Sequence, residues 1–281
     1  MERRRSSLFP FKLSLNTSTL LPYGLDVKEQ VSVAAEAGYE GIELWVRDIE
    51  AYLAKGGNLQ ELRRYIEDHG LKVANAIAFW AWADRDPEAR KRGFDQAEKE
   101  MEMLAELGCL AAAAPPFGQV ADVTLDDFAA SFAKLAELAR RIGIEPYLEF
   151  WGKAARLNGL KDAIYVAQAS GVAEAKILID PFHMYTGGSE LQDLDGLSGS
   201  RIGIVHVNDY PAAPARSEIQ DAQRVFPGDG IAPSGALART LADAGYEGYL
   251  SLELFMDSYG GATALETAKL GIAKIREAYG L

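Results

Sequence analysis

Eight short apolar segments recur along the 281 residues, and each is followed by a longer segment with the residue spacing of an amphipathic helix. Apolar residues three and four apart over residues 127–143, with Gly143 at the end, predict one such helix, and residues 263–280 predict the last one. The eight predicted strands are FKLSLNT (11–17), YEGIELWV (39–46), LKVANAIAF (71–79), CLAAAAP (109–115), IEPYLEFW (144–151), KILIDPF (176–182), RIGIVHVND (201–209) and YEGYLSLELF (246–255). Eight strand–helix units in about 250 residues are the content of a (β/α)8 barrel, so we predict an α/β fold with a single TIM-barrel domain over residues 1–281.

A five-residue repeat supports this architecture. AGYEG occurs at residues 37–41 and again at 244–248, each time between a predicted helix and a predicted strand, which indicates that one helix-to-strand turn is used twice. The alternative is an open doubly wound sheet. That fold would be favoured by a glycine-rich phosphate-binding turn after an early strand, and the sequence has none.

Composition and charge exclude several classes of protein. The net charge of −12 and the pI of about 4.8 would repel a nucleic-acid backbone. No apolar run approaches the ~20 residues that a membrane span needs. We do not expect the basic start MERRR to begin a signal peptide, because Pro10 and Lys12 interrupt the apolar segment that follows, and we predict a cytoplasmic protein. Cys109, the only cysteine, excludes an internal disulfide and a cysteine-cluster metal site, and its apolar neighbours predict a buried, inert thiol.

Polar side chains stand at the ends of the last four predicted strands, where a barrel brings strand ends together at one mouth. They are Glu149, Asp180, His206 and Glu253. Any one of them could be a buried ion pair or a satisfied core histidine. Together, among apolar neighbours and with no lysine or arginine in those strand ends, they predict one divalent cation, since unpaired buried charges would cost several kcal/mol each. Oxygen ligands with a single nitrogen suit Mn, Mg or Co, and zinc accepts them too.

The segment ILIDPFHMYTGG, residues 177–188, carries both an acid and a histidine at a strand end. We predict that Asp180 is a metal ligand. His183 follows Pro181 and Phe182, which turn it away from that ligand set, so it is expected to reach over the mouth toward a substrate.

These motifs resemble those of the xylose isomerase-like TIM barrels, the sugar isomerase and epimerase superfamily, over essentially the whole chain. The elements are LEF with Glu149, D-x-x-H with Asp180 and His183, HVND with His206 and Asp209, R-x-x-P-G-x-G with Arg224, and LSLELF with Glu253. The resemblance implies that Glu149, Asp180, His206 and Glu253 hold one divalent metal ion. It also implies that His183 and Arg224 contact substrate, and we expect Asp209 to do so too.

Within that superfamily the second half of the chain is most similar to 2-keto-myo-inositol (inosose) isomerases. Ketose 3-epimerases carry E-x-x-N-R after the fifth strand, and the sequence EFWGKAARLNG departs from it. Endonuclease IV-type repair enzymes share the barrel but use extra histidines for three metals, whereas this chain has only three histidines in all.

The implied activity is isomerisation or epimerisation of a small polyhydroxy ketone, an inosose or a keto-sugar. The metal would act as a Lewis acid and stabilise an enediolate, while Glu149 and Glu253 move the proton as base and acid. Arg224 and His183 would hold substrate oxygens. A dehydratase that expels a β-hydroxyl from the same enediolate is the main alternative, and a non-catalytic sugar-binding barrel is a third.

Further residues near the strand ends complete the predicted pocket. Glu43 is expected to orient substrate or a ligand, with a purely structural carboxylate as the alternative. An aromatic wall is predicted from Trp45, Trp80, Trp82, Trp151 and Phe182, with Trp151 in contact with substrate. Lys153 and Arg156 are the only close basic pair after these strands, which favours an unphosphorylated substrate. Association with further copies of the chain is left open.

Overall fold

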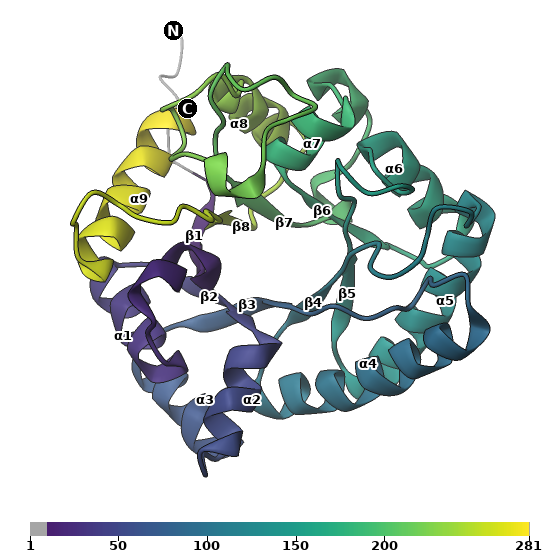
Figure 1. The fold of residues 1–281 in the computed structure, drawn as a ribbon, viewed down its shortest axis with the longest axis horizontal. Coiled ribbons are helices and arrows are strands. Elements are labelled where there is room, and N and C mark those ends of the chain that lie inside the picture. Colours follow the sequence, from purple (N-terminus) through teal and green to yellow (C-terminus); the bar gives the residue numbers. More distant parts are fainter. Residues whose placement is uncertain (1–9, 281) are drawn as a thin grey trace, which may run out of the picture.

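A computed structural model describes residues 10–280 of the chain. Eight parallel strands form a closed barrel in sequence order, and β1 completes the ring by pairing with β8 (Figure 1). The strands are β1 (Lys12–Asn16), β2 (Gly41–Trp45), β3 (Lys72–Ile77), β4 (Ala111–Ala114), β5 (Glu145–Leu148), β6 (Lys176–Ile179), β7 (Ile202–Val207) and β8 (Tyr249–Leu252). The predicted TIM barrel is therefore confirmed, with each strand inside its predicted segment. The basic head of the chain, for which we predicted no signal peptide, lies outside the described residues.

Helices surround the barrel and separate consecutive strands (Figure 1). They are α1 (Val27–Ala37), α2 (Val46–Ala54), α3 (Leu59–Asp68), α4 (Pro87–Leu107), α5 (Leu125–Ile142), α6 (Leu160–Ala169), α7 (Pro181–Gly187), α8 (Ser234–Asp243) and α9 (Ala264–Ala278). Short 3-10 turns are η1 (Thr17–Tyr23), η2 (Leu191–Leu194), η3 (Gly199–Arg201) and η4 (Asp221–Gln223). No described helix combines the length and the apolar character that crossing a membrane requires.

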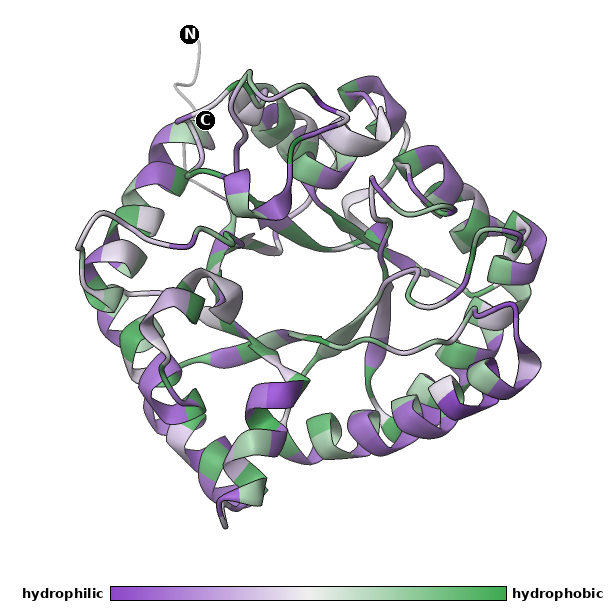
Figure 2. Cartoon of the chain, in the orientation of Figure 1, coloured by the Kyte–Doolittle hydropathy of each residue, from purple (hydrophilic) through white to green (hydrophobic). Residues whose placement is uncertain are grey.

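The helix α5 illustrates why these segments fold as they do. Thr124 and Asp127 form a capping box at its start, and Gly143 ends it with φ 94°, a backbone conformation that glycine adopts without strain. Its apolar stripe, which includes Phe128 and Phe132, is buried against the barrel. Figure 2 shows the same pattern around the ring, since the strands are mostly hydrophobic and the helices alternate between hydrophobic and hydrophilic residues.

The repeated AGYEG segments do form equivalent turns. In both, the glycine lies in the left-handed region, with φ 99° at Gly38 and 76° at Gly245. The N–H of the tyrosine that follows donates to the carbonyl five residues earlier, at 3.1 Å for Tyr39 and 2.9 Å for Tyr246. Each turn therefore closes a helix and starts the chain toward the next strand, β2 in one case and β8 in the other.

The single cysteine has the environment that its sequence predicts. Cys109 is buried, and its Sγ donates to the carbonyl of Ala111 at 3.1 Å. Burial raises the pKa of the thiol to about 12, so the reactive thiolate is scarce at neutral pH.

Candidate metal centre

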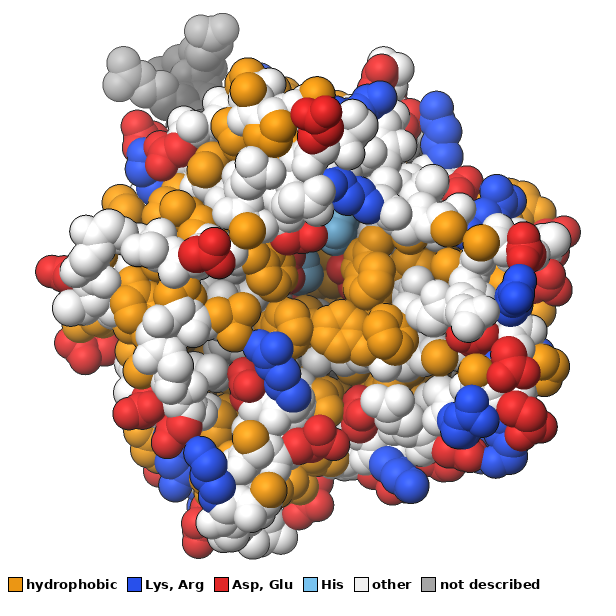
Figure 3. Space-filling view, in the orientation of Figure 1, with side chains coloured by type: hydrophobic (Ala, Val, Ile, Leu, Met, Phe, Trp, Pro, Cys, Tyr) orange, Lys and Arg blue, Asp and Glu red, His pale blue; other side chains and the backbone are white. Residues whose placement is uncertain are grey.

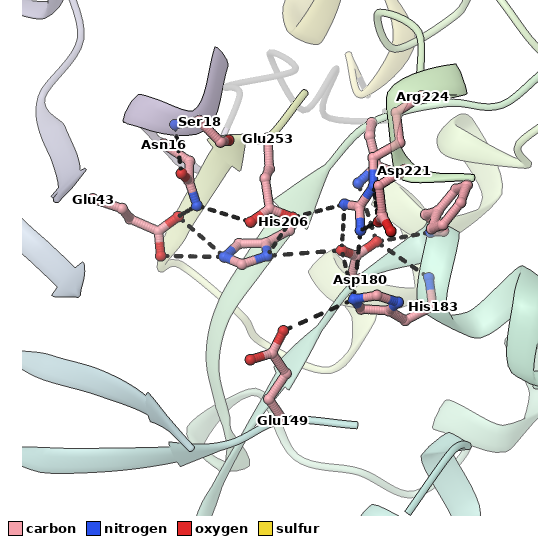
Figure 4. A network of polar contacts seen from close by, with 12 residues as sticks. Asn16, Ser18, Glu43, Glu149, Asp180, His183, His206, Asp221, Arg224 and Glu253 are labelled. Carbon is pink, nitrogen blue, oxygen red and sulfur yellow. Dashed lines mark hydrogen bonds and ion pairs between the residues drawn. The ribbon is translucent and has the colours of Figure 1, made fainter. Parts of the chain in front are cut away.

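Three of the four predicted metal ligands converge at the carboxyl ends of the strands (Figure 4). Asp180 directly follows β6, His206 lies in β7 and Glu253 directly follows β8. All three are buried, and one donor atom from each lies within 4.8 Å of the others. Glu149, which follows β5, is outside this group of three. Its Oε1 lies 3.9 Å from Nε2 of His183, and that nitrogen lies 3.9 Å from Oδ2 of Asp180.

Asp180 uses its two carboxylate oxygens for different purposes. Its Oδ1 accepts the backbone N–H of Phe182 at 2.7 Å and of His183 at 3.4 Å, which makes Asp180 the N-cap of α7. The amide of Asn208 donates to the same oxygen at 3.0 Å. Its Oδ2 instead faces the centre, 3.7 Å from Nδ1 of His206. The sequence D-P-F-H thus ends a strand, caps a helix and leaves the second carboxylate oxygen facing the centre.

The two carboxylate oxygens of Glu253 also make different contacts. Its Oε1 accepts a hydrogen bond from the side-chain amide of Asn16 at 3.0 Å, which sets the orientation of the carboxylate. Its Oε2 lies 3.1 Å from Nδ1 of His206 and therefore faces the centre.

The imidazole of His206 is held from behind by a second carboxylate. Its Nε2 lies 3.1 Å from Oε2 of Glu43, and Glu43 in turn accepts hydrogen bonds from Asn75 at 2.8 Å and from Asn16 at 3.2 Å. In the neutral imidazole, an Nε2–H that donates to Glu43 leaves the lone pair on Nδ1, and this buried atom has no hydrogen-bond partner among the described residues. This ring nitrogen and the two carboxylate oxygens that it faces together form a donor set suited to a divalent cation. A carboxylate that contacts the other nitrogen of a ligating histidine, as Glu43 does here, is typical of metal sites.

Electrostatics favour positive charge at this place. Burial by itself would lower the pKa of His206, but the carboxylates of Glu253 and Glu43 outweigh burial and raise it well above the usual value. The residues present therefore fit a bound dication, which would supply the positive charge that these carboxylates attract.

A positively charged side chain, that of Arg224, also reaches this centre. The residues at the strand ends alone did not predict this contact. Arg224 is buried, and its Nη1 donates to Oδ2 of Asp180 at 2.8 Å and to Oε2 of Glu253 at 2.6 Å. Burial alone would raise the pKa of Asp180, but the Arg224 guanidinium holds it well below the ordinary value. The absence of lysine and arginine from the strand ends is thus incomplete evidence for a metal, because the loop after β7 contributes an arginine.

A cavity of about 430 Å³ opens above these residues. Figure 3 shows the hollow in this face, bordered by hydrophobic side chains, with histidine and acidic side chains visible inside it. Its lining contains Trp45, Ile77, Phe79, Glu149, Trp151, Lys153, Ala154, Phe182, His183, Asp221, Arg224, Glu253 and Phe255. The predicted substrate contacts His183, Arg224 and Trp151 therefore share one cavity with both predicted catalytic carboxylates.

His183 and Glu149 lie 3.9 Å apart in the cavity, and burial shifts the pKa of each. Burial lowers the pKa of His183 to about 4, so the imidazole is neutral at pH 7. Burial raises the pKa of Glu149 to about 8, so in the metal-free protein this carboxyl group is able to hold a proton near neutral pH.

Two predicted substrate contacts do not line the cavity. Both oxygens of the buried Asp209 accept backbone N–H groups, from Tyr210 at 2.7 Å, Ala232 at 2.7 Å and Gly228 at 3.0 Å, so the carboxylate holds the loop after β7 in place. Glu43 is likewise buried behind His206. Their predicted contact with substrate is corrected to these supporting positions, although Glu43 does orient a candidate ligand.

The aromatic wall is partly different from the one predicted. Trp45, Trp151 and Phe182 line the cavity, whereas Trp80 and Trp82 are completely buried in the core. Their indole N–H groups donate to Glu100 and to the carbonyl of Pro115, both inside the protein. Phe79 and Phe255 take their place in the wall, with ring centroids 5.5 Å and 6.1 Å from that of Trp45.

Sequence reasoning missed two polar residues of the site. Asn16 ends β1 and joins Glu43, Glu253 and the indole of Trp45 through hydrogen bonds of 3.0–3.2 Å. Its position at a strand end was a usable signal. Asp221 accepts from Arg224 at 2.7 Å, and its place in a long loop offered no such signal.

Comparisons with known proteins agree with this architecture. A family model described as xylose isomerase-like TIM barrel matches residues 31–278. An inosose isomerase of Bacillus velezensis is 27% identical over 265 residues, which cover 92% of this chain and 93% of that protein. A 3-dehydroshikimate dehydratase of Pseudomonas aeruginosa is 28% identical over 255 residues, covering 88% of this chain but 39% of that longer protein. The crystal structure of the IOLI protein, described with a binding zinc atom, superposes with a TM-score of 0.88 at 24% identity and covers 96% of this chain and 98% of that one.

Proposed function

The chain belongs to the xylose isomerase-like TIM barrel family, and we propose that it is a divalent-metal-dependent isomerase or epimerase of a small polyhydroxy ketone, with 2-keto-myo-inositol as the first candidate substrate. The observation that carries the proposal is the convergence of the donor atoms of Asp180, His206 and Glu253 in a buried group that opens into the cavity of Glu149 and His183. The similarity to inosose isomerases over nine-tenths of both chains supports the choice of substrate.

In the proposed enzyme, Asp180, His206 and Glu253 hold the metal through the atoms that face the centre, and Glu149 is the fourth ligand from the adjacent strand. When bound, the metal supplies Lewis-acid polarisation of the substrate carbonyl. Three carboxylates and one imidazole are compatible with Mn, Mg, Co and Zn, and the donor set does not choose among them.

The chain's own residues would carry out the proton transfer. Glu149 and Glu253 both line the cavity, from β5 and β8, so a substrate between them meets one carboxylate on each side. One removes the proton from the carbon beside the carbonyl to give an enediolate, and the other returns a proton to the neighbouring carbon or to the opposite face.

Arg224 and His183 would hold the substrate oxygens. Nη2 of Arg224 donates to Nε2 of the neutral His183 at 3.4 Å, and both side chains line the same cavity. A guanidinium in a buried site stabilises the negative charge that develops on the substrate oxygens as the proton leaves. The aromatic wall of Trp45, Phe79, Trp151, Phe182 and Phe255 would pack against the apolar face of the ring and exclude water.

Turnover of 2-keto-myo-inositol in D2O tests the chemistry. Proton transfer through an enediolate places deuterium at the carbon beside the carbonyl, and NMR of recovered substrate and product reads the label. The Glu253→Gln protein, loaded with metal, should lose this exchange. Wild-type turnover by a metal-loaded Glu253→Gln protein would rule Glu253 out as the acid or base.

A dehydratase is the second candidate, favoured by the similarity to 3-dehydroshikimate dehydratase. The same enediolate would then expel a β-hydroxyl group rather than accept a second proton. The D2O experiment separates the two activities, since a dehydratase yields an unsaturated product and an isomerase yields a saturated ketone of unchanged mass apart from the label.

A further inference from the structure

The guanidinium of Arg224 is shared between two sets of carboxylates (Figure 4). Its Nη1 donates to Asp180 and Glu253, as described above. Its Nε and Nη2 both donate to Oδ1 of Asp221, at 3.1 Å and 2.7 Å. One end of the fork therefore contacts the candidate ligands, and the other end contacts a residue that has no part in the ligand set.

The two sets differ strongly in their exposure. The side chains of Asp180 and Arg224 are each 1% exposed, whereas that of Asp221 is 48% exposed. The ring centroids of Phe182 and Phe255 lie 4.5 Å and 5.1 Å from the guanidinium carbon, so both rings pack against the guanidinium. Asp221 thus attracts the guanidinium toward the surface, and Asp180 and Glu253 attract it toward the buried centre.

The inward contacts compete with a metal ion. Nη1 donates to Oδ2 of Asp180 and Oε2 of Glu253, which are the same oxygens that face Nδ1 of His206. A dication held by these oxygens would lie close to a full positive charge in a buried site, where charges interact far more strongly than in water. The affinity for the metal therefore depends on how far the guanidinium is drawn away.

We propose that Asp221 is a positioning residue of the metal centre: by holding Arg224 through Nε and Nη2, it limits the positive charge resting on Asp180 and Glu253 and so sets the affinity for the divalent ion. This inference rests on the metal centre of the proposed function. It assigns Asp221 an effect through Arg224, without contact between Asp221 and the metal.

Titration of metal-free protein with Mn²⁺, followed by the EPR signal of the free ion, tests the inference in a double-mutant cycle. Asp221→Asn should weaken Mn²⁺ binding by about tenfold or more, because the guanidinium then rests fully on the ligands. Arg224→Gln should bind Mn²⁺ more tightly than the wild type. In the Arg224→Gln background, Asp221→Asn should change the dissociation constant by less than about twofold.

Three further variants serve as controls. Asp221→Glu keeps the carboxylate and should restore most of the affinity, and Glu218→Gln removes an exposed charge from the same loop and should leave it unchanged. Arg224→Met provides a second background without the arginine, should Arg224→Gln fold poorly, because methionine fills more of the space between Phe182 and Phe255 than glutamine does.

Equal weakening by Asp221→Asn with and without Arg224 would mean that Asp221 acts on the metal directly, and it would overturn the inference alone. An unchanged affinity of Asp221→Asn in the wild-type background would overturn it as well. A wild-type protein that binds no Mn²⁺ would instead overturn the proposed metal centre, and this inference with it.

Discussion

Each side chain of the candidate metal centre uses one atom to hold its own position and leaves another facing inward. Oδ1 of Asp180 caps α7, Oε1 of Glu253 accepts from Asn16, and Nε2 of His206 lies against Glu43. This division explains how buried polar groups remain oriented without a metal, since each is anchored by at least one hydrogen bond of 2.7–3.2 Å. The atoms left over are those that we expect to bind the ion.

Removal of the imidazole tests this arrangement most directly. We expect purified protein to contain about one divalent ion per chain, and His206→Ala to lose it because one of the three converging donors is removed. Elemental analysis of both proteins after gel filtration measures the metal content. His69→Ala is the matched control, since His69 precedes β3 and therefore lies at the end of the barrel opposite to the candidate metal centre. Full metal content in His206→Ala would exclude His206 as a ligand.

The carboxylate behind the histidine should matter nearly as much as a ligand. Glu43→Gln keeps the shape of the side chain but removes the charge that orients Nε2–H of His206. We expect metal affinity to fall by about 10- to 100-fold, measured by competition with a chromophoric chelator. Glu36→Gln, an exposed glutamate on α1, is the control. Equal affinity in Glu43→Gln and wild type would show that Glu43 has no role in the centre.

Among the elements, the long connection between β7 and α8 is the one that brings Arg224 and Asp221 to the site. An isolated bridge between Asp209 and Val225 ties this loop to the end of β7, with N–O distances of 2.9 Å and 2.8 Å. The side chain of Asp209 then accepts three further backbone N–H groups from the loop. The motif R-x-x-P-G-x-G is therefore positioned by an aspartate that never faces the cavity.

Loss of that aspartate should loosen the loop as a unit. Asp209→Ala leaves three backbone N–H groups without an acceptor, and we expect the free energy of unfolding to fall by roughly 2–4 kcal/mol. Urea unfolding measures the stability, and limited proteolysis within residues 210–233 reports on the loop. Asp229→Ala, in the same loop but half exposed and paired with Lys274, should change stability by less than about 0.5 kcal/mol. Similar losses in the two variants would contradict the role given to Asp209.

For the whole molecule, closure of the barrel determines which distant residues meet. Asn16 and Glu253 are 237 positions apart and share a hydrogen bond because β1 pairs with β8. A metal held between β6, β7 and β8 would therefore stabilise the closed ring as well as the site, since it bridges strands that must all be in place.

Removal of the metal should lower the stability of the entire chain. At a free metal concentration 100 times its dissociation constant, binding contributes about 2.7 kcal/mol, which corresponds to a decrease in Tm of roughly 5–10 °C after chelation. Differential scanning calorimetry with and without EDTA measures the change, and re-addition of the ion should reverse it. The His206→Ala protein should show no response to EDTA, and a decrease equal to that of the wild type would place the stabilising ion elsewhere.

The amino-acid sequence by itself determined the eight strand–helix units, the helix stops at glycine, and the positions of Glu149, Asp180, His206 and Glu253 at strand ends. These follow from local backbone preferences and from the period of apolar residues, which are properties of neighbouring positions. Only the tertiary structure decided which oxygen of each carboxylate faces inward, that Glu43 and Asp209 support the site from behind, and that Trp80 and Trp82 belong to the core. It also decided that Arg224 reaches Asp180 across 44 positions of sequence. Such contacts depend on the closure of the ring and on the path of a long loop, and side-chain pairing over those separations leaves no periodic trace in the sequence.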